Sequence, residues 1–170
     1  MRLKAKAAIL VGLFLIASIS WMVFNNNPKV NNEYLDFGSN IPQLYPVLGI
    51  DVSHYQGDIN WEQVSRMNKE GDSIQFAFIK ATEGLSVLDD KLERNVKGAR
   101  KHQIDCGFYH YFIPTLSALD QADFFVDESF DYDFSLKPVI DIEVDGELSS
   151  NQLMDSITVF LDRVEERIGE

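Results

Sequence analysis

Two carboxylates, Asp141 and Glu143, stand two residues apart in the apolar run from Pro138 to Glu143. If this run is a strand, both side chains project to the same side, about 6 to 7 Å apart at roughly 3.3 Å per residue. Two carboxylates in apolar surroundings tend to separate their pKa values, so that one is protonated and the other ionised. Glycoside hydrolysis needs this division, because one acid protonates the leaving oxygen and a negative group stabilises the anomeric carbon. An Asp-x-Glu pair alone is too common to specify that chemistry.

Three other polar or aromatic clusters also follow apolar runs. They are Asp51 to Gly57, Lys80 to Gly84 and Tyr109 to Phe112. The carboxyl ends of parallel strands meet at one edge of a sheet, where α/β sheets and β/α barrels place their active sites. We therefore expect all four clusters at one site, with Asp51 as a third acid. The alternative for Asp51 is that it caps the turn before Gly57.

The same clusters supply candidate substrate-binding residues. Tyrosine rings offer flat faces on which sugars can rest, whereas Trp61 and Phe112 are expected to pack in the core. His54 could hydrogen-bond within its loop or contact substrate, and Lys80 could form a supporting ion pair with Glu83. The candidate substrate-binding residues are His54, Tyr55, Glu83, Tyr109 and Tyr111.

From Val47 onward, short apolar runs alternate with longer amphipathic ones, a pattern typical of βα units. Asn60 and Ser117 have the residue type and spacing of helix N-caps. The fold prediction is an α/β, TIM-like (β/α) barrel of which the chain holds about four βα units. The expected strands are 47–53, 74–81, 105–112 and 138–143, and the expected helices are 61–69, 89–102, one opened by Ser117, and one from 149 or 151 to 168.

The N-terminal segment has the composition of an export signal. Three basic residues precede the uncharged apolar run 7–24, which is expected to form an N-terminal apolar helix. Residues 1–24 are predicted to be a signal peptide or transmembrane signal anchor, the uncleaved anchor being favoured, and 25–46 a linker to a catalytic domain at 47–170. This domain would face outward from the membrane or, after cleavage, be secreted or periplasmic.

Composition excludes several other classes of function. The net charge of −12 argues against a nucleic-acid partner, which would require clustered Lys and Arg. The single cysteine, Cys106, excludes an intramolecular disulfide and is expected to be a small buried hydrophobe. No cofactor or metal is expected. A divalent-metal hydrolase that uses Asp51, Asp141 and Glu143 as oxygen ligands is the chemical alternative.

Five motifs in order resemble those of the glycoside hydrolase family 25 lysozymes. The resemblance implies an irregular β/α barrel that hydrolyses the β-1,4 bond between N-acetylmuramic acid and N-acetylglucosamine in peptidoglycan. It further implies Glu143 as general acid, Asp141 as the residue that positions or assists the substrate's acetamido group, and Asp51 as a supporting acid. The motifs are Gly-Ile-Asp-Val-Ser-His-Tyr-Gln-Gly (49–57), Phe-Ile-Lys-Ala-Thr-Glu-Gly (78–84), Gly-Phe-Tyr-His-Tyr-Phe (107–112), Gln-Ala-Asp (121–123) and Pro-Val-Ile-Asp-Ile-Glu (138–143).

The sequence departs from this family after Glu143. Family members continue through several more strands, whereas this chain ends at Glu170. Since four βα units cannot close an eight-stranded barrel, we expect a truncated product or fragment whose first and fourth strands have open edges. Two hypotheses about function follow. One is a muramidase, and the other is a peptidoglycan-binding or interaction protein without the chemistry.

Overall fold

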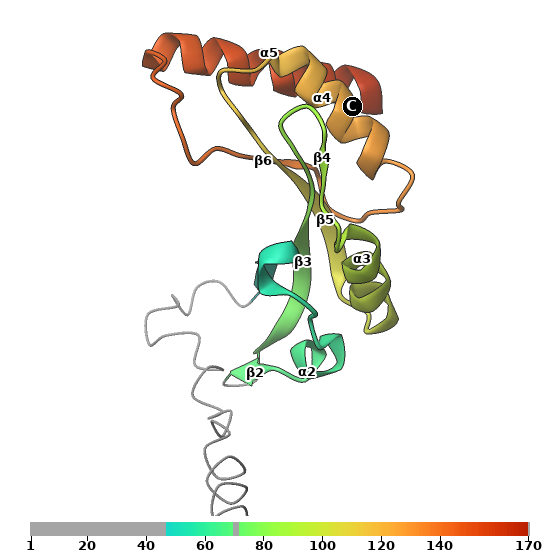
Figure 1. Ribbon diagram of the computed structural model, residues 1–170. Coiled ribbons are helices and arrows are strands. Elements are labelled where there is room, and N and C mark those ends of the chain that lie inside the picture. Colours follow the sequence, from blue (N-terminus) through green and yellow to red (C-terminus); the bar gives the residue numbers. More distant parts are fainter. Residues whose placement is uncertain (1–46, 70–71, 170) are drawn as a thin grey trace, which may run out of the picture. The chain divides into compact units, whose positions relative to one another are not determined.

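The computed structural model describes residues 47–69 and 72–169. Its main sheet has four parallel strands in the order β1-β3-β5-β6 (Figure 1). Within the described residues, β1 and β6 pair on one side only, as the sequence predicts. The parallel strands are β1 (Leu48–Val52), β3 (Asp72–Glu83), β5 (Asp105–Tyr111) and β6 (Val139–Asp141), and two short strands, β2 (Asn68–Lys69) and β4 (Val87–Leu88), pair antiparallel with β3.

A helix follows each parallel strand, which confirms the four expected βα units. The helices are α2 (Trp61–Ser65), α3 (Leu92–Lys101), α4 (Ala118–Ser129) and α5 (Ser150–Ile168), and a short 3-10 turn, η2 (His54–Gln56), precedes α2. Helices α4 and α5 lie side by side (Figure 1). The α/β class and the parallel sheet are therefore confirmed, and the curved four-stranded sheet corresponds to part of a barrel.

Three predicted boundaries are wrong, the first two for identifiable reasons. Helix α2 ends at Ser65, because residues 68–69 pair with β3 instead of continuing the helix. Helix α3 begins at Leu92 and not at Asp89, whose carboxylate Oδ1 accepts the backbone N–H of Lys91 at 3.0 Å. Strand β6 ends at Asp141, so Glu143 lies in the following loop and not on the strand.

The face of the sheet toward α4 and α5 is a closed core, in which His110 is fully buried. The Thr82 hydroxyl lies 2.8 Å from Nδ1 of His110, and Gln121 Oε1 lies 3.2 Å from Nε2. Gln121 Oε1 also accepts the N–H of Ile113 at 2.9 Å, so the bonds are satisfied if Nε2 carries the ring proton. Burial lowers the pKa of His110 to about 4, and Phe160 stacks on its ring. His110 is therefore a neutral structural histidine.

The opposite face of the sheet begins with two phenylalanine rings that lie over glycines of neighbouring strands. A Cβ added to Gly49 in β1 would lie 2.1 Å from the ring of Phe76, and one added to Gly107 in β5 would lie 2.6 Å from the ring of Phe78. Glycine is therefore required at both positions if the rings are to remain in place. Farther along the same face, toward the carboxyl ends of the strands, the residues become polar.

The predicted apolar helix at 7–24 and the linker at 25–46 lie outside the described residues. Over 47–69 and 72–169, the structure contains no helix long and apolar enough to cross a membrane. Attachment to a membrane through residues 7–24 and a location outside the cytoplasm stay predictions.

Candidate active site

The three acids lie at the carboxyl ends of the two outer parallel strands. Asp51 is the penultimate residue of β1, Asp141 is the last residue of β6, and Glu143 follows two residues later. Partial burial is the main cause that raises the pKa of Asp141, and the negative charges of Glu143 and Asp51 raise it further. The positive charge of Lys80 acts in the opposite direction. The three acids therefore share one electrostatic environment, although β1 and β6 are separated by two strands.

The register of the sheet explains why these side chains face the same way. Asp51 pairs with Phe78, Lys80 pairs with Tyr109, and Tyr111 pairs with Asp141. Paired residues of neighbouring strands project to the same side of a sheet, and residues two apart on a strand do so as well. The face that also carries Phe78, away from α4 and α5, thus holds Asp51, Asp141, Lys80 and the two tyrosines.

Lys80 occupies the middle of this arrangement and is 3% exposed. Its Nζ donates to Oε2 of Glu83 at 2.6 Å, which confirms the expected ion pair. The same Nζ lies 4.9 Å from the ring centroid of Tyr111 and 5.7 Å from that of Tyr55, both within cation–π range. Lys80 therefore connects the predicted substrate-binding residues Tyr55, Glu83 and Tyr111. A lysine inside an apolar strand was the sequence signal for this role.

The two tyrosines of β5 are held in the protonated phenol form. Burial raises the pKa of Tyr109 to about 12; a hydrogen bond with Ser53 opposes this change, and the charges of Asp51 and Asp141 add to it. Burial also raises the pKa of Tyr111, with Glu143 as the largest charge contribution. Both hydroxyls can therefore donate hydrogen bonds beside the acids. Contact of these rings with a sugar stays a prediction.

His54 and Tyr55 form one side of the candidate site. Tyr55 is 78% exposed, and its ring centroid lies 4.0 Å from that of His54. His54 Nδ1 lies 2.8 Å from Oδ2 of Asp89, a partner 35 residues away, so it does not simply bond within its own loop. Asp89 was not among the predicted site residues. The sequence signal for it was an aspartate directly before an amphipathic helix.

The alternative role of Asp51 as the cap of this loop is wrong. Ser53 caps η2, because its hydroxyl accepts the N–H of Tyr55 at 3.2 Å. The Gln56 side chain returns the contact by accepting the N–H of Ser53 at 2.8 Å. Asp51 remains exposed and faces the other acids.

The geometry of the acids does not favour a metal hydrolase. In the described part of the chain, one group of residues, His54, Asp89 and Asp90, has ligand atoms within 4.8 Å of one another. Asp51, Asp141 and Glu143 do not form such a group. The oxygens of Asp89 already accept two backbone N–H groups and face His54 Nδ1, so this cluster is accounted for by hydrogen bonding.

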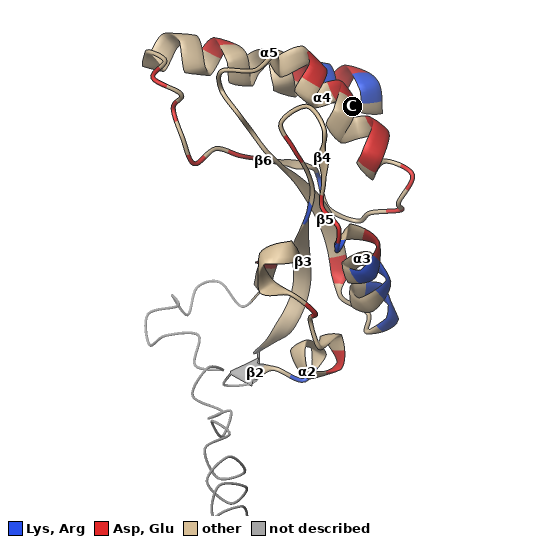
Figure 2. Ribbon diagram, in the orientation of Figure 1, with Lys and Arg blue, Asp and Glu red and all other residues tan. Residues whose placement is uncertain are grey.

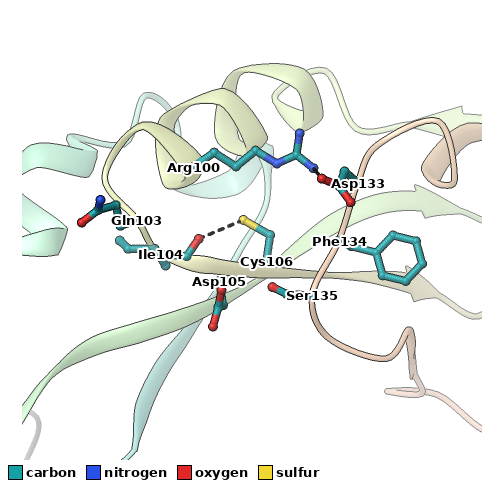
Figure 3. Close-up of a pocket in the computed structure, with 8 residues that line it drawn as sticks. All are labelled: Arg100, Gln103, Ile104, Asp105, Cys106, Asp133, Phe134 and Ser135. Atoms are coloured by element: carbon teal, nitrogen blue, oxygen red, sulfur yellow. Dashed lines mark hydrogen bonds and ion pairs between the residues drawn. The ribbon is translucent and has the colours of Figure 1, made fainter.

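A separate cavity of about 350 Å³ lies at the other end of β5 (Figure 3). Its wall includes Arg100, Asp133 and Cys106, and the thiol of Cys106 donates to the carbonyl oxygen of Ile104 at 3.4 Å. Cys106 is 3% exposed, which confirms its expected burial. Since Cys106 is at the amino end of β5 and Tyr111 at the carboxyl end, this cavity is distinct from the acidic site.

Four βα units whose parallel strands lie in sequence order, with acids at their carboxyl ends, define an α/β protein consistent with part of a barrel. Comparison with known sequences specifies it further, because residues 50–170 match the model of glycosyl hydrolases family 25. The chain belongs to this family, as the motifs predicted. The chain is 40% identical over 135 residues to the Escherichia coli protein YegX, itself uncharacterized, and the match covers 79% of this chain and 49% of YegX.

Solved structures agree with this assignment. The chain is similar to a lysozyme from Streptomyces coelicolor, with 36% identity and a TM-score of 0.63 over 71% of this chain and 58% of that one. It is also similar to a family 25 glycosyl hydrolase from Bacillus anthracis, with 31% identity and a TM-score of 0.67 over 77% of this chain and 60% of that one. The chain spans about half the length of YegX.

Proposed function

We propose that this protein is a lysozyme of the muramidase type, which cuts the β-1,4 bond between N-acetylmuramic acid and N-acetylglucosamine in peptidoglycan. The observation that carries the proposal is that Asp51 and Asp141 lie on one face of the sheet near the buried Lys80, with the charge of Glu143 close to Asp141 from the loop beyond β6. Similarity to a bacterial lysozyme supports the same substrate class.

The proposed roles follow from exposure and charge. Glu143 lies beyond the strand and is exposed, so a bridging oxygen of a polymer can reach it, and it acts as general acid. Asp141 is partly buried beside Lys80 and Tyr111, where it positions or assists the acetamido group. Partial burial raises the pKa of Asp141, and the negative charge of Glu143 raises it further. Asp51 adds negative charge near the developing positive anomeric carbon.

One observation favours a second candidate function, a peptidoglycan-binding protein that does not cut the glycan. Within the part of the chain that the structure describes, the Glu143 carboxylate has no hydrogen-bond or salt-bridge partner. A general acid needs a defined direction for its proton. In this alternative, the tyrosines and Lys80 bind the glycan, and Glu143 takes no part in a reaction.

Purified cell walls separate the two functions. We expect the 170-residue chain to lower the turbidity of a wall suspension and to release reducing ends. The conservative substitution Glu143→Gln should reduce the rate by about 10²- to 10⁴-fold, the usual contribution of a general acid. Binding to insoluble peptidoglycan should persist in this variant, because the substitution keeps the size of the side chain.

The matched control is Glu147→Gln, which removes the same charge from an exposed residue of the same loop. We expect its rate to stay within about twofold of the wild type. Equal losses in both variants would assign the effect to net charge rather than to acid catalysis. Binding without release of reducing ends by the folded wild-type chain would establish the second candidate.

We further propose that the protein works outside the cytoplasm, where peptidoglycan lies, and that residues 7–24 direct it there. The support is the basic and then apolar composition of the first 24 residues. Cells are treated so that protease reaches the outer side of the cytoplasmic membrane but does not cross it. The protease should then digest the domain and leave cytoplasmic marker proteins intact. Complete protection of the domain in that assay would contradict the proposed location.

A further inference from the structure

Asp89 lies between β4 and α3 and is 3% exposed. Its backbone N–H donates to the carbonyl oxygen of Ala81 at 2.9 Å, and its Oδ1 accepts the N–H of Lys91 at 3.0 Å. The carboxylate is thus held by the end of β3 on one side and by the start of α3 on the other. These two contacts therefore fix the position of its second carboxylate oxygen, Oδ2.

Both contacts of Oδ2 are with His54. Oδ2 accepts the backbone N–H of His54 at 3.0 Å and lies 2.8 Å from Nδ1 of the ring. An ionised carboxylate has no proton to donate, so the proton of this bond belongs to Nδ1. In a neutral imidazole the other nitrogen, Nε2, is then a hydrogen-bond acceptor.

The free side of the ring lies beside the candidate site. About a third of the His54 side chain, 35%, is exposed. Among the described residues, none forms a hydrogen bond with Nε2. The ring lies 4.0 Å from that of Tyr55, whose centroid is 5.7 Å from Nζ of Lys80. Nε2 is therefore available to a ligand that also contacts Tyr55.

We infer that Asp89 is a positioning residue, which fixes the His54 ring with Nδ1–H inward and presents Nε2 as an acceptor for a hydroxyl or amide N–H of an amino sugar. The identity of this ligand rests on the proposed function. The orientation and tautomer of the ring do not, because they follow from the contacts of Asp89 in the free protein. Asp89 itself does not contact the substrate.

The tautomer can be measured directly, since the chain has only three histidines. In a ¹H–¹⁵N correlation spectrum of the ring nitrogens, recorded without ligand, we expect His54 to carry its proton on Nδ1. His110 should show the opposite tautomer, with the proton on Nε2, and it serves as an internal reference for the folded state. A proton on Nε2 of His54 at the pH of the binding assay would overturn the inference.

Two matched substitutions test whether Asp89 is the cause. Asp89→Ala removes the acceptor, so the Nδ1–H tautomer of His54 should lose its predominance while the His110 signals stay unchanged. Asp90→Ala, at the exposed neighbouring residue, should leave both histidines as they are. An unchanged His54 tautomer in a folded Asp89→Ala variant would overturn the inference. If that variant does not fold, the wild-type spectrum still tests the predicted tautomer of His54.

Binding of a soluble β-1,4-linked N-acetylglucosamine oligomer tests the ligand. We expect His54→Gln and Asp89→Ala each to raise Kd by about five- to tenfold, the effect of one hydrogen bond. KM should rise more than kcat falls. The double variant should bind no more weakly than His54→Gln alone, because Asp89 acts through the ring.

The binding outcomes separate this inference from the proposed function. An additional loss from Asp89→Ala in the His54→Gln background would show that Asp89 acts on the site by another route, and it would overturn the inference. A wild-type chain that binds no glycan but shows the expected tautomers would overturn the proposed function and the ligand assigned to Nε2. The positioning of His54 by Asp89 would stand.

Discussion

The two faces of the sheet differ in how their polar groups are paired. On the face toward α4 and α5, Thr82, His110 and Gln121 bond to one another in a fully buried network. On the opposite face, Asp51 and Glu143 place negative charge near Asp141, and Lys80 offsets part of it. Figure 2 shows that basic residues elsewhere lie mainly on α3 and at the end of α5. The buried His110 network pairs its polar groups, whereas the acidic face keeps like charges together.

This difference separates stability from function within one sheet. A buried polar group that has all its partners costs little, whereas like charges held together lower the stability of the fold. Clusters of like charges that lower stability in this way are typically retained because a functional site needs them. Substitutions on the α4/α5 face should therefore lower stability, and neutralisation of an acid on the other face should raise it.

The largest effect is expected for Phe160→Ala in α5. Phe160 is 1% exposed, and its ring lies 5.1 Å from that of His110 and 5.7 Å from that of Phe112. Removal of a buried phenylalanine ring costs about 3 to 5 kcal/mol of unfolding free energy. Urea denaturation measures this loss. The control is Leu161→Ala on the same helix, where the side chain is 42% exposed and a much smaller loss is expected.

The next effect is the pH dependence caused by His110. Its pKa is lowered to about 4 in the folded protein, from the ordinary value of 6.5. Between these values the unfolded chain binds the proton and the folded chain does not, so the unfolding free energy decreases as the pH falls. At about 1.4 kcal/mol per pKa unit, roughly 3 kcal/mol is lost between pH 6.5 and pH 4. Urea denaturation at a series of pH values measures the slope.

The assignment to His110 is tested by two substitutions with the same residue. His110→Gln should remove most of the decline between pH 6.5 and pH 4, whatever its cost in absolute stability, and His102→Gln should preserve it. The pKa of the Asp123 carboxyl, which accepts hydrogen bonds from Arg163 and Arg167, is lowered from 3.8, so its stabilising effect is lost only below this window. A slope that survives His110→Gln would contradict the assignment.

Most of the fold could be predicted from the sequence, because the apolar runs and the helix N-caps are local signals. Asn60 and Ser117 each accept the backbone N–H three residues on, as predicted for N-caps, and Ser149 does the same at the start of α5. The end of α2 could not be predicted in this way. Residues 68–69 form a strand because they pair with residues 72–73. This pairing cannot be predicted from the helical periodicity of 61–69.

The meeting of the acids could also be predicted, because parallel topology alone brings Asp51 and Asp141 to one edge. The roles of Lys80 and Asp89 were harder to predict. Each is a charged residue that is 3% exposed, and burial of such a residue depends on its partners. The partner of Asp89 is His54, which is 35 residues away in sequence. Residue type and periodicity give no information about such a pair.

The smallest expected effect, and the one that tests the comparison most directly, is that of Asp141→Asn. The folded protein raises the pKa of this carboxyl above its ordinary value of 3.8, so its ionised form is disfavoured on folding. As the pH rises through these values, the folded chain holds the proton longer and stability declines. We therefore expect the variant to melt at a higher temperature than wild type near neutral pH, with a gain that shrinks toward about pH 3, while cleavage of cell walls is lost.

Asp145→Asn, at an exposed aspartate of the loop after β6, is the matched control and should show no comparable gain. A variant less stable than wild type at neutral pH would contradict a net cost of the ionised Asp141 carboxylate, and the contrast between the two faces would not hold.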